Sequence, residues 1–414
     1  MLENIFDNCP SAPDLTNPDH LALVKEKVSL ILSHTDDISQ LDALEKEWIQ
    51  SKDETTILVL LALKIARSKL IVKNIKEETK VSIVFAVYKE NNRILTSEEH
   101  EHGEDFLRQK AAQLSDLFDE YPHLSWELVI VDDGCPEGSG KIAREIAAKE
   151  GLEDRVRVLF LEEAIAEGLE VTAPMTSTKD SMKGGAITYG MWDAATHSQH
   201  DNHIIVFTDA DLSTHLGQVG LLMDSIINEG KNVCVASRRE GNSVVIKKGS
   251  RNDRGKLFIY LWKHMVPNLS YIIDTQCGFK AFKKETVLHI VNDMIEKKFA
   301  FDIELLLKSE LQQTDSIEKV GVAWIDSEAA STTTDLQPYI WMLKAIAQMY
   351  KKYLPANPQS DEIAQFILDL SKEEFDQLLD NIPTAITDRE PVEFNEFKGV
   401  SAEDLRMAIQ AVQV

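Results

Sequence analysis

Short apolar runs alternate with segments of helical spacing between about residue 80 and residue 330. The runs are rich in β-branched residues, which predicts buried strands. They are VSIVFAVY (81–88), ELVIVDDG (127–134), VRVLFLEE (156–163), IIVF (204–207), VCVASR (233–238) and VGVAWI (320–325). Strands that alternate with helices predict βαβ units and a mostly parallel sheet that helices cover on both faces. The predicted fold is therefore α/β and Rossmann-like.

Both ends of the chain have helical spacing throughout. We therefore expect three parts, namely a helical N-terminal extension (1–79), the α/β domain (80–335) and a helical C-terminal region (336–414). Neither helical part carries a motif that indicates chemistry. We expect each to be an appendage, and an oligomerisation element is one use for such helices.

Polar side chains follow three of the predicted strands at the point where each strand ends. Asp209 and Asp211 come directly after one strand, Asp132-Asp133 after another, and Tyr88-Lys89-Glu90 after the first. Ligands of parallel sheets bind beyond the carboxyl ends of the strands. Two carboxylates one residue apart suit Mg²⁺ or Mn²⁺ held against a diphosphate. The alternative is an Asp cap on a helix that starts near Leu212.

The charge of the chain changes how a phosphate ligand would be bound. The 414 residues carry a formal net charge of −25, which argues against nucleic acid as a partner. A phosphate ligand would then have to be bound by a metal ion or by a local cluster of basic residues. Residues 238–256 form such a cluster, although a solvated basic loop is the default for this pattern. Lys183 and two glycines open a predicted helix, which is either a phosphate cradle or a plain helix start.

The cysteines and the most apolar segment indicate a cytoplasmic protein. The four cysteines lie far apart, without the spacing of a zinc site, so we expect reduced thiols. A bilayer span needs about 20 apolar residues. The best candidate, 57–72, is interrupted by Lys64, Arg67 and Lys69, so a packed amphipathic helix is expected. A helix on the membrane surface is the alternative.

Seven motifs together resemble one family of enzymes. They are VSIVFAVYKENN, ELVIVDDGCPEGS, KGGAITYGM, FTDADLST, VASRR, DTQCGFKAF and FDIELL, in this order. The set resembles the family 2 inverting glycosyltransferases of GT-A fold, most closely the group of dolichyl-phosphate β-glucosyltransferases and polyprenyl-phosphate-mannose synthases. The resemblance covers about residues 80–330, and DTQCGFK with DADLST is its most specific part.

The resemblance implies a donor site for a nucleotide sugar. In this family the base and ribose pocket would be lined by Ala86, Tyr88 and Glu90, and by Asp132 and Asp133, of which Asp133 is favoured. Lys183 would lie near the nucleotide. Asp209 and Asp211 would bind Mg²⁺ or Mn²⁺, with Asp209 also facing the donor. UDP-glucose is the preferred donor and GDP-mannose the second.

The resemblance also implies an acceptor side. Arg238, Arg251 and Arg254 would meet phosphates of donor or acceptor, and Asp274, Gln276 and Asp302 would face the sugar and the acceptor. A phosphate acceptor is already ionised and needs cations, whereas a hydroxyl acceptor needs a carboxylate base. Asp302 or Asp274 is then the candidate base, and Glu304 is less favoured. The candidate catalytic residues are thus Asp302, Asp274 and Arg238, each with a structural cap or ion pair as the alternative.

Three departures from the family pattern bear on the acceptor. The chain lacks a convincing membrane segment, a long loop (164–182) precedes KGG, and Ser331-Thr332 replaces the usual Ser-Lys or Ser-Arg. A soluble acceptor, or a polyprenyl phosphate reached from the membrane surface, fits these departures. A non-catalytic nucleotide-sugar-binding scaffold is the alternative function. A sugar nucleotidyltransferase would need a Gly-rich loop after the first strand, and VYKENN has none.

Overall fold

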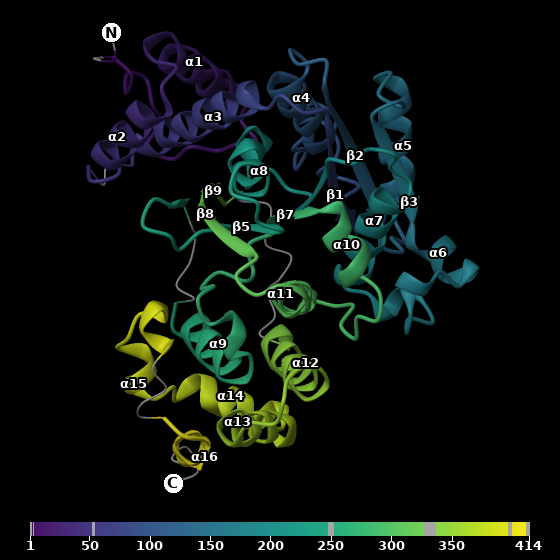
Figure 1. Cartoon of the computed structure of the whole chain (residues 1–414), viewed down its shortest axis with the longest axis vertical. Helices are drawn as coiled ribbons and strands as arrows, with labels where there is room; N and C mark the ends of the chain where they lie inside the picture. The colour runs from purple at the N-terminus through teal and green to yellow at the C-terminus, as the bar shows by residue number, and fades with distance from the viewer. Residues whose placement is uncertain are drawn as a thin grey trace.

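A seven-stranded sheet forms the centre of the protein in the computed structural model, which describes residues 2, 4–51, 54–246, 252–326, 337–395 and 400–410 (Figure 1). The strand order is β3-β2-β1-β4-β7-β5-β8. Only β7 runs antiparallel to its neighbours β4 and β5, while the other paired strands of this sheet are parallel. The strands are β1 (Thr79–Val87), β2 (Leu124–Asp132), β3 (Val156–Phe160), β4 (His203–Thr208), β5 (Val233–Ser237), β7 (Phe279–Lys283) and β8 (Ile317–Gly321). The predicted α/β fold with a mostly parallel central sheet is confirmed.

Alternate residues of the strands enter two separate cores. In β1, Ile83 and Phe85 join one core and Val84 the other, as the period of two requires. The first core is covered by α4 (Phe106–Phe118), α5 (Ser139–Lys149) and α8 (Val219–Ile227). The second is covered by α7 (Gly184–Thr196), α10 (Lys284–Ile290) and α11 (Phe301–Gln312). Helices therefore cover both faces of the sheet.

The N-terminal helices share the first core with the sheet. They are α1 (Pro18–His34), α2 (Ile38–Trp48) and α3 (Thr56–Asn74). The α3 helix packs on α8, where the Gly220 amide donates to Ser68 Oγ at 2.9 Å and a Cβ on Gly220 would lie 2.5 Å from Ser68 O. The predicted helix at 57–72 is thus packed inside the protein. Within the described residues, none of the helices has the length and apolar character that a membrane span requires.

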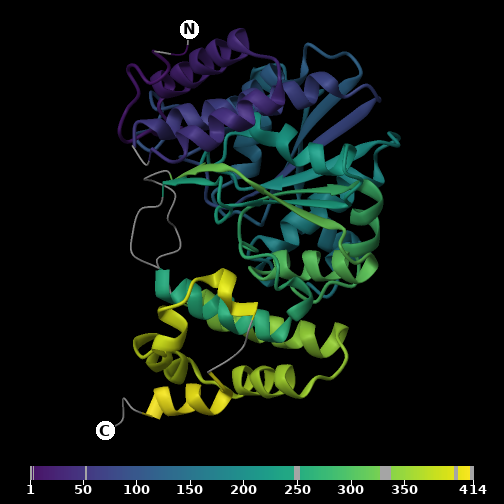
Figure 2. The same cartoon turned by 60° about the vertical axis from the view of Figure 1, so that its left-hand side comes forward.

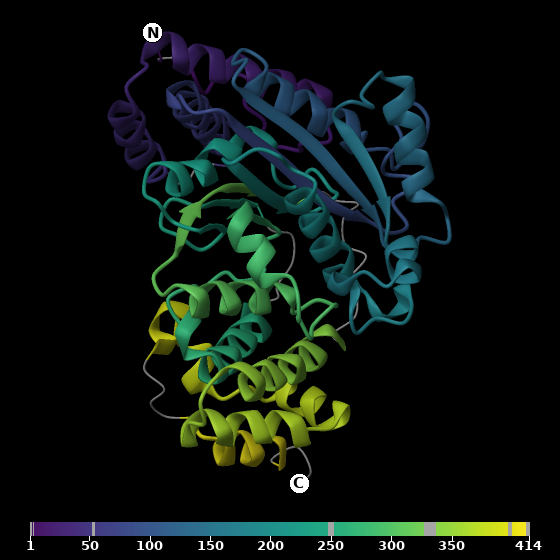
Figure 3. The ribbon, with the colours of Figure 1, turned by 45° about the vertical axis from the view of Figure 1, so that its right-hand side comes forward.

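The C-terminal helices pack around α9 (Asn252–Met265) at the opposite end of the molecule from the N-terminal helices (Figures 2 and 3). Lys256 Nζ of α9 donates to Thr387 O at 2.9 Å, and Tyr260 OH donates to Val400 O at 2.8 Å. These helices are α12 (Gln337–Tyr353), α13 (Pro358–Asp369), α14 (Lys372–Asp380), α15 (Thr384–Thr387) and α16 (Ala402–Gln410). The predicted boundary at 335/336 lies outside the described residues, and the three-part division stays a prediction.

The remaining elements lie in the connections. The segment predicted as a long loop (164–182) instead contains the end of α6 (Leu161–Glu167) and two short 3-10 helices, η1 (Glu170–Thr172) and η2 (Thr178–Asp180). The other 3-10 helices are η3 (Leu216–Gln218), η4 (Pro267–Leu269) and η5 (Pro391–Asn395). The strands β6 (Val244–Ile246) and β9 (Ala323–Ile325) form a separate parallel pair.

A buried ion pair joins the N-terminal helices to the α/β domain. Lys64 Nζ of α3 lies 2.6 Å from Glu45 Oε1 of α2 and donates to Gly321 O at 2.8 Å, while Asn242 Nδ2 donates to Glu45 Oε2 at 3.1 Å. Replacement of Lys64 by Met is expected to lower the free energy of unfolding by about 3 kcal/mol, because it leaves the Glu45 charge buried and unpaired. Urea denaturation measures this loss.

A matched control for this prediction is the exposed pair between Lys25 and Asp116, with 3.7 Å between Nζ and Oδ1. Lys25→Met should change the free energy of unfolding by less than about 0.5 kcal/mol. Equal losses for the two variants would show that the buried pair has no special role in attaching the N-terminal helices.

Candidate active site

A cleft of about 820 Å³ opens at the carboxyl ends of β1, β2 and β4. This volume is within the range of small-molecule sites. Its lining includes most residues of the predicted donor site, namely Ala86, Tyr88, Glu90, Asp133, Lys183, Asp209 and Asp211. The polar strand ends that the sequence places on separate strands therefore do meet in one cleft.

Asp209 lines this cleft and forms an ion pair with Lys183. Burial raises the pKa of Asp209, but Lys183 and then Arg238 together lower it by more than burial raises it. The pKa therefore lies below its usual range, and the carboxyl stays ionised. Burial lowers the pKa of Lys183, and Asp209 more than reverses this. A Cβ on Gly278 would lie 2.3 Å from Asp209 Oδ2, so the glycine of DTQCGF makes room for this carboxylate.

Asp211 is held by main-chain groups and by a buried lysine. The Ser213 amide donates to Asp211 Oδ1 at 3.0 Å, and Lys110 Nζ donates to Asp211 O at 2.7 Å. The chain bends from 211 to 214, and α8 begins only at Val219. The alternative of a capped helix near Leu212 is therefore wrong.

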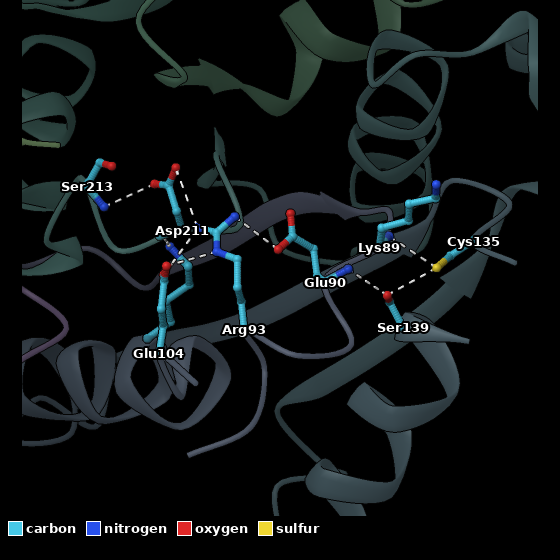
Figure 4. Close-up of polar contacts among 9 residues, drawn as sticks. Lys89, Glu90, Arg93, Glu104, Cys135, Ser139, Asp211 and Ser213 are labelled. Carbon is cyan, nitrogen blue, oxygen red and sulfur yellow. Dashed lines mark hydrogen bonds and ion pairs between the residues drawn. The ribbon is translucent and has the colours of Figure 1, made fainter. Parts of the chain in front are cut away.

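Arg93 stands between Asp211 and two glutamates, and nothing in the sequence singled it out (Figure 4). Its Nε and NH2 donate to Glu104 Oε1 and Oε2 at 2.9 and 3.1 Å, and its NH1 donates to Glu90 Oε2 at 3.0 Å. Its NH2 also lies 3.9 Å from Asp211 Oδ2. Burial raises the pKa of Glu90 to about 7 against the effect of Arg93, and Asp211 adds to the rise.

The two predicted aspartates after β2 have different surroundings. Asp132 Oδ1 and Oδ2 accept from the amides of Cys135 and Gly140, both at 2.7 Å, so this carboxylate holds the turn into α5. Asp133 lines the cleft, and its buried Oδ1 has no hydrogen-bond partner among the described residues. Burial raises the pKa of Asp133 to about 7, although the Ser181 hydroxyl opposes this. Asp133 is thus the carboxyl available to a ligand.

Arg238, which is partly exposed, pairs with the buried Asp274 beside the cleft. Arg238 Nε and NH2 donate to Asp274 Oδ2 and Oδ1 at 2.8 and 2.9 Å, and the Arg238 amide donates to Oδ2 at 2.8 Å. Burial raises the pKa of Asp274, but Arg238 outweighs it and brings the pKa to about 2. Asp274 is therefore a poor general base. Neither residue is among those that line the cleft.

Asp302 and Gln276 each hold one buried polar atom without a hydrogen-bond partner among the described residues, Oδ1 and Nε2 respectively. Asp302 Oδ2 lies 3.2 Å from the buried Lys280 Nζ. Burial raises the pKa of Asp302 despite Lys280 and Lys183. Glu304 instead accepts from the amides of Ile295 and Glu296, at 2.8 and 2.7 Å.

The predicted basic cluster is divided in the structure. Arg254 NH2 lies 4.0 Å from Asp380 Oδ1 of α14, and Lys256 is bonded to Thr387 and Glu390. Arg251, Lys247 and Lys248 lie outside the described residues, as do Ser331 and Thr332. Among the described members, Arg238 therefore stands nearest the candidate site, through its effect on Asp209.

Comparison with known proteins agrees with the resemblance of the motifs. No protein-family model matches the chain. It is 26% identical over 257 residues to the dolichyl-phosphate β-glucosyltransferase of Drosophila melanogaster, covering 60% of this chain and 68% of that protein. The human enzyme of the same name is 27% identical over 217 residues, covering 50% of this chain and 59% of the relative. The chain is thus similar to proteins named dolichyl-phosphate β-glucosyltransferase, as its motifs imply.

The similarity extends to a yeast relative and to a solved structure. The dolichyl-phosphate β-glucosyltransferase of Saccharomyces cerevisiae is 24% identical over 262 residues, covering 60% of this chain and 67% of that protein. The chain thus spans about 59 to 68% of the length of these three relatives. Glucosyl-3-phosphoglycerate synthase of Mycobacterium tuberculosis, solved with Mn²⁺, UDP-glucose and phosphoglyceric acid, is 18% identical with a TM-score of 0.46, covering 71% of this chain and 85% of that one.

Proposed function

We propose that this glycosyltransferase moves a hexose, with inversion, from a nucleotide sugar in the 820 Å³ cleft to a phosphate or hydroxyl acceptor. UDP-glucose is the preferred donor and GDP-mannose the second. The observation that carries the proposal is the meeting of Asp133, Lys183 and the Asp209–Asp211 pair in this one cleft. The Asp133 carboxylate can accept hydrogen bonds from a base or ribose, and the Lys183 ammonium can pair with the diphosphate. A cytoplasmic location and an oligomer formed by the helical ends stay predictions.

Asp209 and Asp211 are the residues that would hold Mg²⁺ or Mn²⁺. Among the described residues, no group of three or more His, Cys, Asp or Glu side chains forms a closed metal cage. This fits a cation that is held by one or two carboxylates and completed by the phosphates of a substrate. The acidic surroundings also favour a cation, since Asp211 and Asp209 both raise the pKa of Glu90. The ion would neutralise the leaving diphosphate.

The acceptor side gives Asp302 and Asp274 different roles. The pKa of Asp302 is raised and its Oδ1 is unpaired among the described residues, so Asp302 is the better base for a hydroxyl acceptor. The Arg238–Asp274 pair presents a guanidinium whose charge would favour an acceptor phosphate. With a phosphate acceptor, no base is required.

Donor turnover tests the proposed function. UDP-glucose and GDP-mannose would be incubated with Mn²⁺ or Mg²⁺, with dolichyl phosphate, 3-phosphoglycerate or neither as acceptor, and release of the nucleoside diphosphate would be measured. We expect release from UDP-glucose that requires the divalent ion and stops in EDTA. Binding without release under all conditions would favour the scaffold alternative, and absence of binding by both donors would reject the proposed donor site.

The raised pKa of Asp133 predicts a pH dependence of nucleotide binding. The N–H and O–H groups of a base or ribose donate hydrogen bonds best to an ionised carboxylate. The affinity for UDP should therefore fall as the pH drops from 8 to 6, through the Asp133 pKa of about 7. Because the folded pKa lies above the usual value, the ionised group costs stability above pH 7. Asp133→Asn should therefore remove this pH dependence of binding while raising the free energy of unfolding at pH 8 by on the order of 2 kcal/mol.

Calorimetric titration of UDP at pH 6, 7 and 8, with urea denaturation at the same values, measures both effects. Asp132→Asn serves as the neighbouring control, and it should destabilise the protein because its carboxylate holds two amides. An unchanged pH profile in Asp133→Asn would remove Asp133 from the binding site.

A further inference from the structure

The connection between β1 and α4, together with α4 itself, brings two cations to the second aspartate of the candidate metal site. Arg93 NH2 lies 3.9 Å from the Asp211 carboxylate, and Lys110 Nζ donates to the Asp211 main-chain oxygen at 2.7 Å. Both cations are buried, with the Arg93 side chain 11% exposed and Lys110 fully enclosed. Figure 4 shows the Arg93 guanidinium between Glu90 on one side and Asp211 and Glu104 on the other.

Glu104 fixes the position of this guanidinium. Its two carboxylate oxygens accept from Arg93 Nε and NH2, in a two-point contact that restricts rotation. The main chain supports the contact, because the Glu104 amide donates to Arg93 O at 2.9 Å and the Asp105 amide donates to Leu95 O at 2.8 Å. The Glu104 side chain is 3% exposed, so its charge depends on Arg93 for compensation. Arg93 is thus shared between Glu104, Glu90 and Asp211.

The positive charge of Arg93 has two opposite effects on ligand binding. A fixed positive charge close to Asp211 repels a free divalent cation. The same charge attracts a nucleoside diphosphate and keeps the Asp211 carboxylate facing the cleft, which Arg93 also lines. The stronger the hold of Glu104 on the guanidinium, the less of its charge is available to Asp211.

We propose that Arg93 is an internal counter-ion of the Asp209–Asp211 pair and acts as a positioning residue. It weakens the binding of a divalent ion alone and strengthens the binding of the ion together with a nucleoside diphosphate. Glu104 sets the strength of this effect. The inference rests on the proposed donor site. Its consequence is that the cation and the diphosphate bind together, instead of the cation occupying the site beforehand.

Calorimetry with MnCl2 alone, and with UDP at saturating Mn²⁺, tests the inference without any turnover. Arg93→Met should lower the Kd for Mn²⁺ alone about tenfold and raise the Kd for UDP about tenfold. Arg93→Lys should remain within about threefold of the unchanged protein in both, since it keeps the charge. Glu104→Gln should raise the Kd for Mn²⁺ alone about fivefold, because the released guanidinium then acts more fully on Asp211.

The matched control is Arg157, whose Nε donates to Glu127 Oε2 at 2.9 Å outside the cleft. Arg157→Met breaks a comparable pair and should leave both affinities unchanged. The double variant Arg93→Met/Glu104→Gln removes both charges of the Arg93–Glu104 contact, so Glu104 is not left as a buried unpaired charge. It should bind Mn²⁺ more tightly than the unchanged protein, even where Arg93→Met alone folds poorly.

Shifts of Mn²⁺ affinity in the same direction for Arg93→Met and Glu104→Gln would overturn the inference, because a purely structural role weakens both. So would a loss of Mn²⁺ affinity in the double variant. Failure of the proposed donor site looks different, since the unchanged protein would then bind neither Mn²⁺ nor UDP, and loss of turnover with binding retained leaves the inference standing. The two failures are therefore distinguishable in the first titration.

Discussion

Replacement of Asp209 by Asn is expected to lower the rate of hexose transfer at least about a thousandfold, which corresponds to about 4 kcal/mol of transition-state stabilisation. Asp209 supplies a negative charge to the proposed metal site, and its carboxylate is paired with Lys183 and lies against Gly278. The neutral amide would weaken the hold on a divalent ion and release the Lys183 ammonium. The loss should appear in kcat, because the charge on the leaving diphosphate develops in the transition state.

The measurement is release of UDP from UDP-glucose under single-turnover conditions, with thermal unfolding recorded for the same sample. Asp201→Asn is a matched control, since Asp201 is an exposed residue just before the opposite end of β4. It should retain full activity. An Asp209→Asn protein that keeps more than about a tenth of the rate would show that this carboxylate does not take part in the reaction.

Replacement of Arg238 by Met is expected to reduce both stability and transfer. The Asp274 carboxylate is buried and accepts three hydrogen bonds from Arg238, so loss of the guanidinium leaves its charge uncompensated. We expect a loss of about 3 to 5 kcal/mol in the free energy of unfolding. We also expect a loss of about a hundredfold in kcat/KM, because the variant lacks the cation that we propose acts on the phosphates of donor or acceptor.

The double variant Arg238→Met/Asp274→Asn separates the two effects. Removing both charges should restore most of the stability that Arg238→Met loses, because no unpaired charge is then buried. Transfer should stay low if the guanidinium acts on a phosphate. Urea denaturation and kcat/KM for UDP-glucose are the measurements. Recovery of transfer together with stability would reduce Arg238 to a structural role.

The sequence predicts β1, β2, β3, β4 and β5 well, because each contains an apolar run that is followed by polar residues. The single strand expected at 320–325 is wrong, because this segment is divided between the end of β8, whose sequence is IEKVG, and β9. The sequence does not predict β7 (Phe279–Lys283), whose second residue is Lys280. A lysine inside a strand breaks the apolar pattern. Lys280 is nevertheless fully buried, because its Nζ donates to Cys277 O at 2.6 Å and lies 3.2 Å from Asp302 Oδ2. Such a long-range pairing leaves no trace in local periodicity.

The candidate site was predictable where its residues follow a strand directly. Asp133, Asp209 and Asp211 were found in this way, and the motif resemblance added Lys183. Arg93 and Glu104 were missed, because they lie in a connection without regular spacing and acquire meaning only through their contacts with each other. The division of the basic stretch could not be predicted for a related reason, since Lys256 reaches Glu390, which is 134 residues away in the sequence.

The most direct test of the donor site is a crystal of the protein grown with UDP and MnCl2, with anomalous diffraction used to locate manganese. The account predicts one strong anomalous peak in the cleft, within coordination distance of an Asp209 or Asp211 oxygen and of the UDP phosphates, with the uridine beside Asp133. A nucleotide bound in this cleft without manganese at either aspartate, or manganese and UDP bound elsewhere, would contradict it.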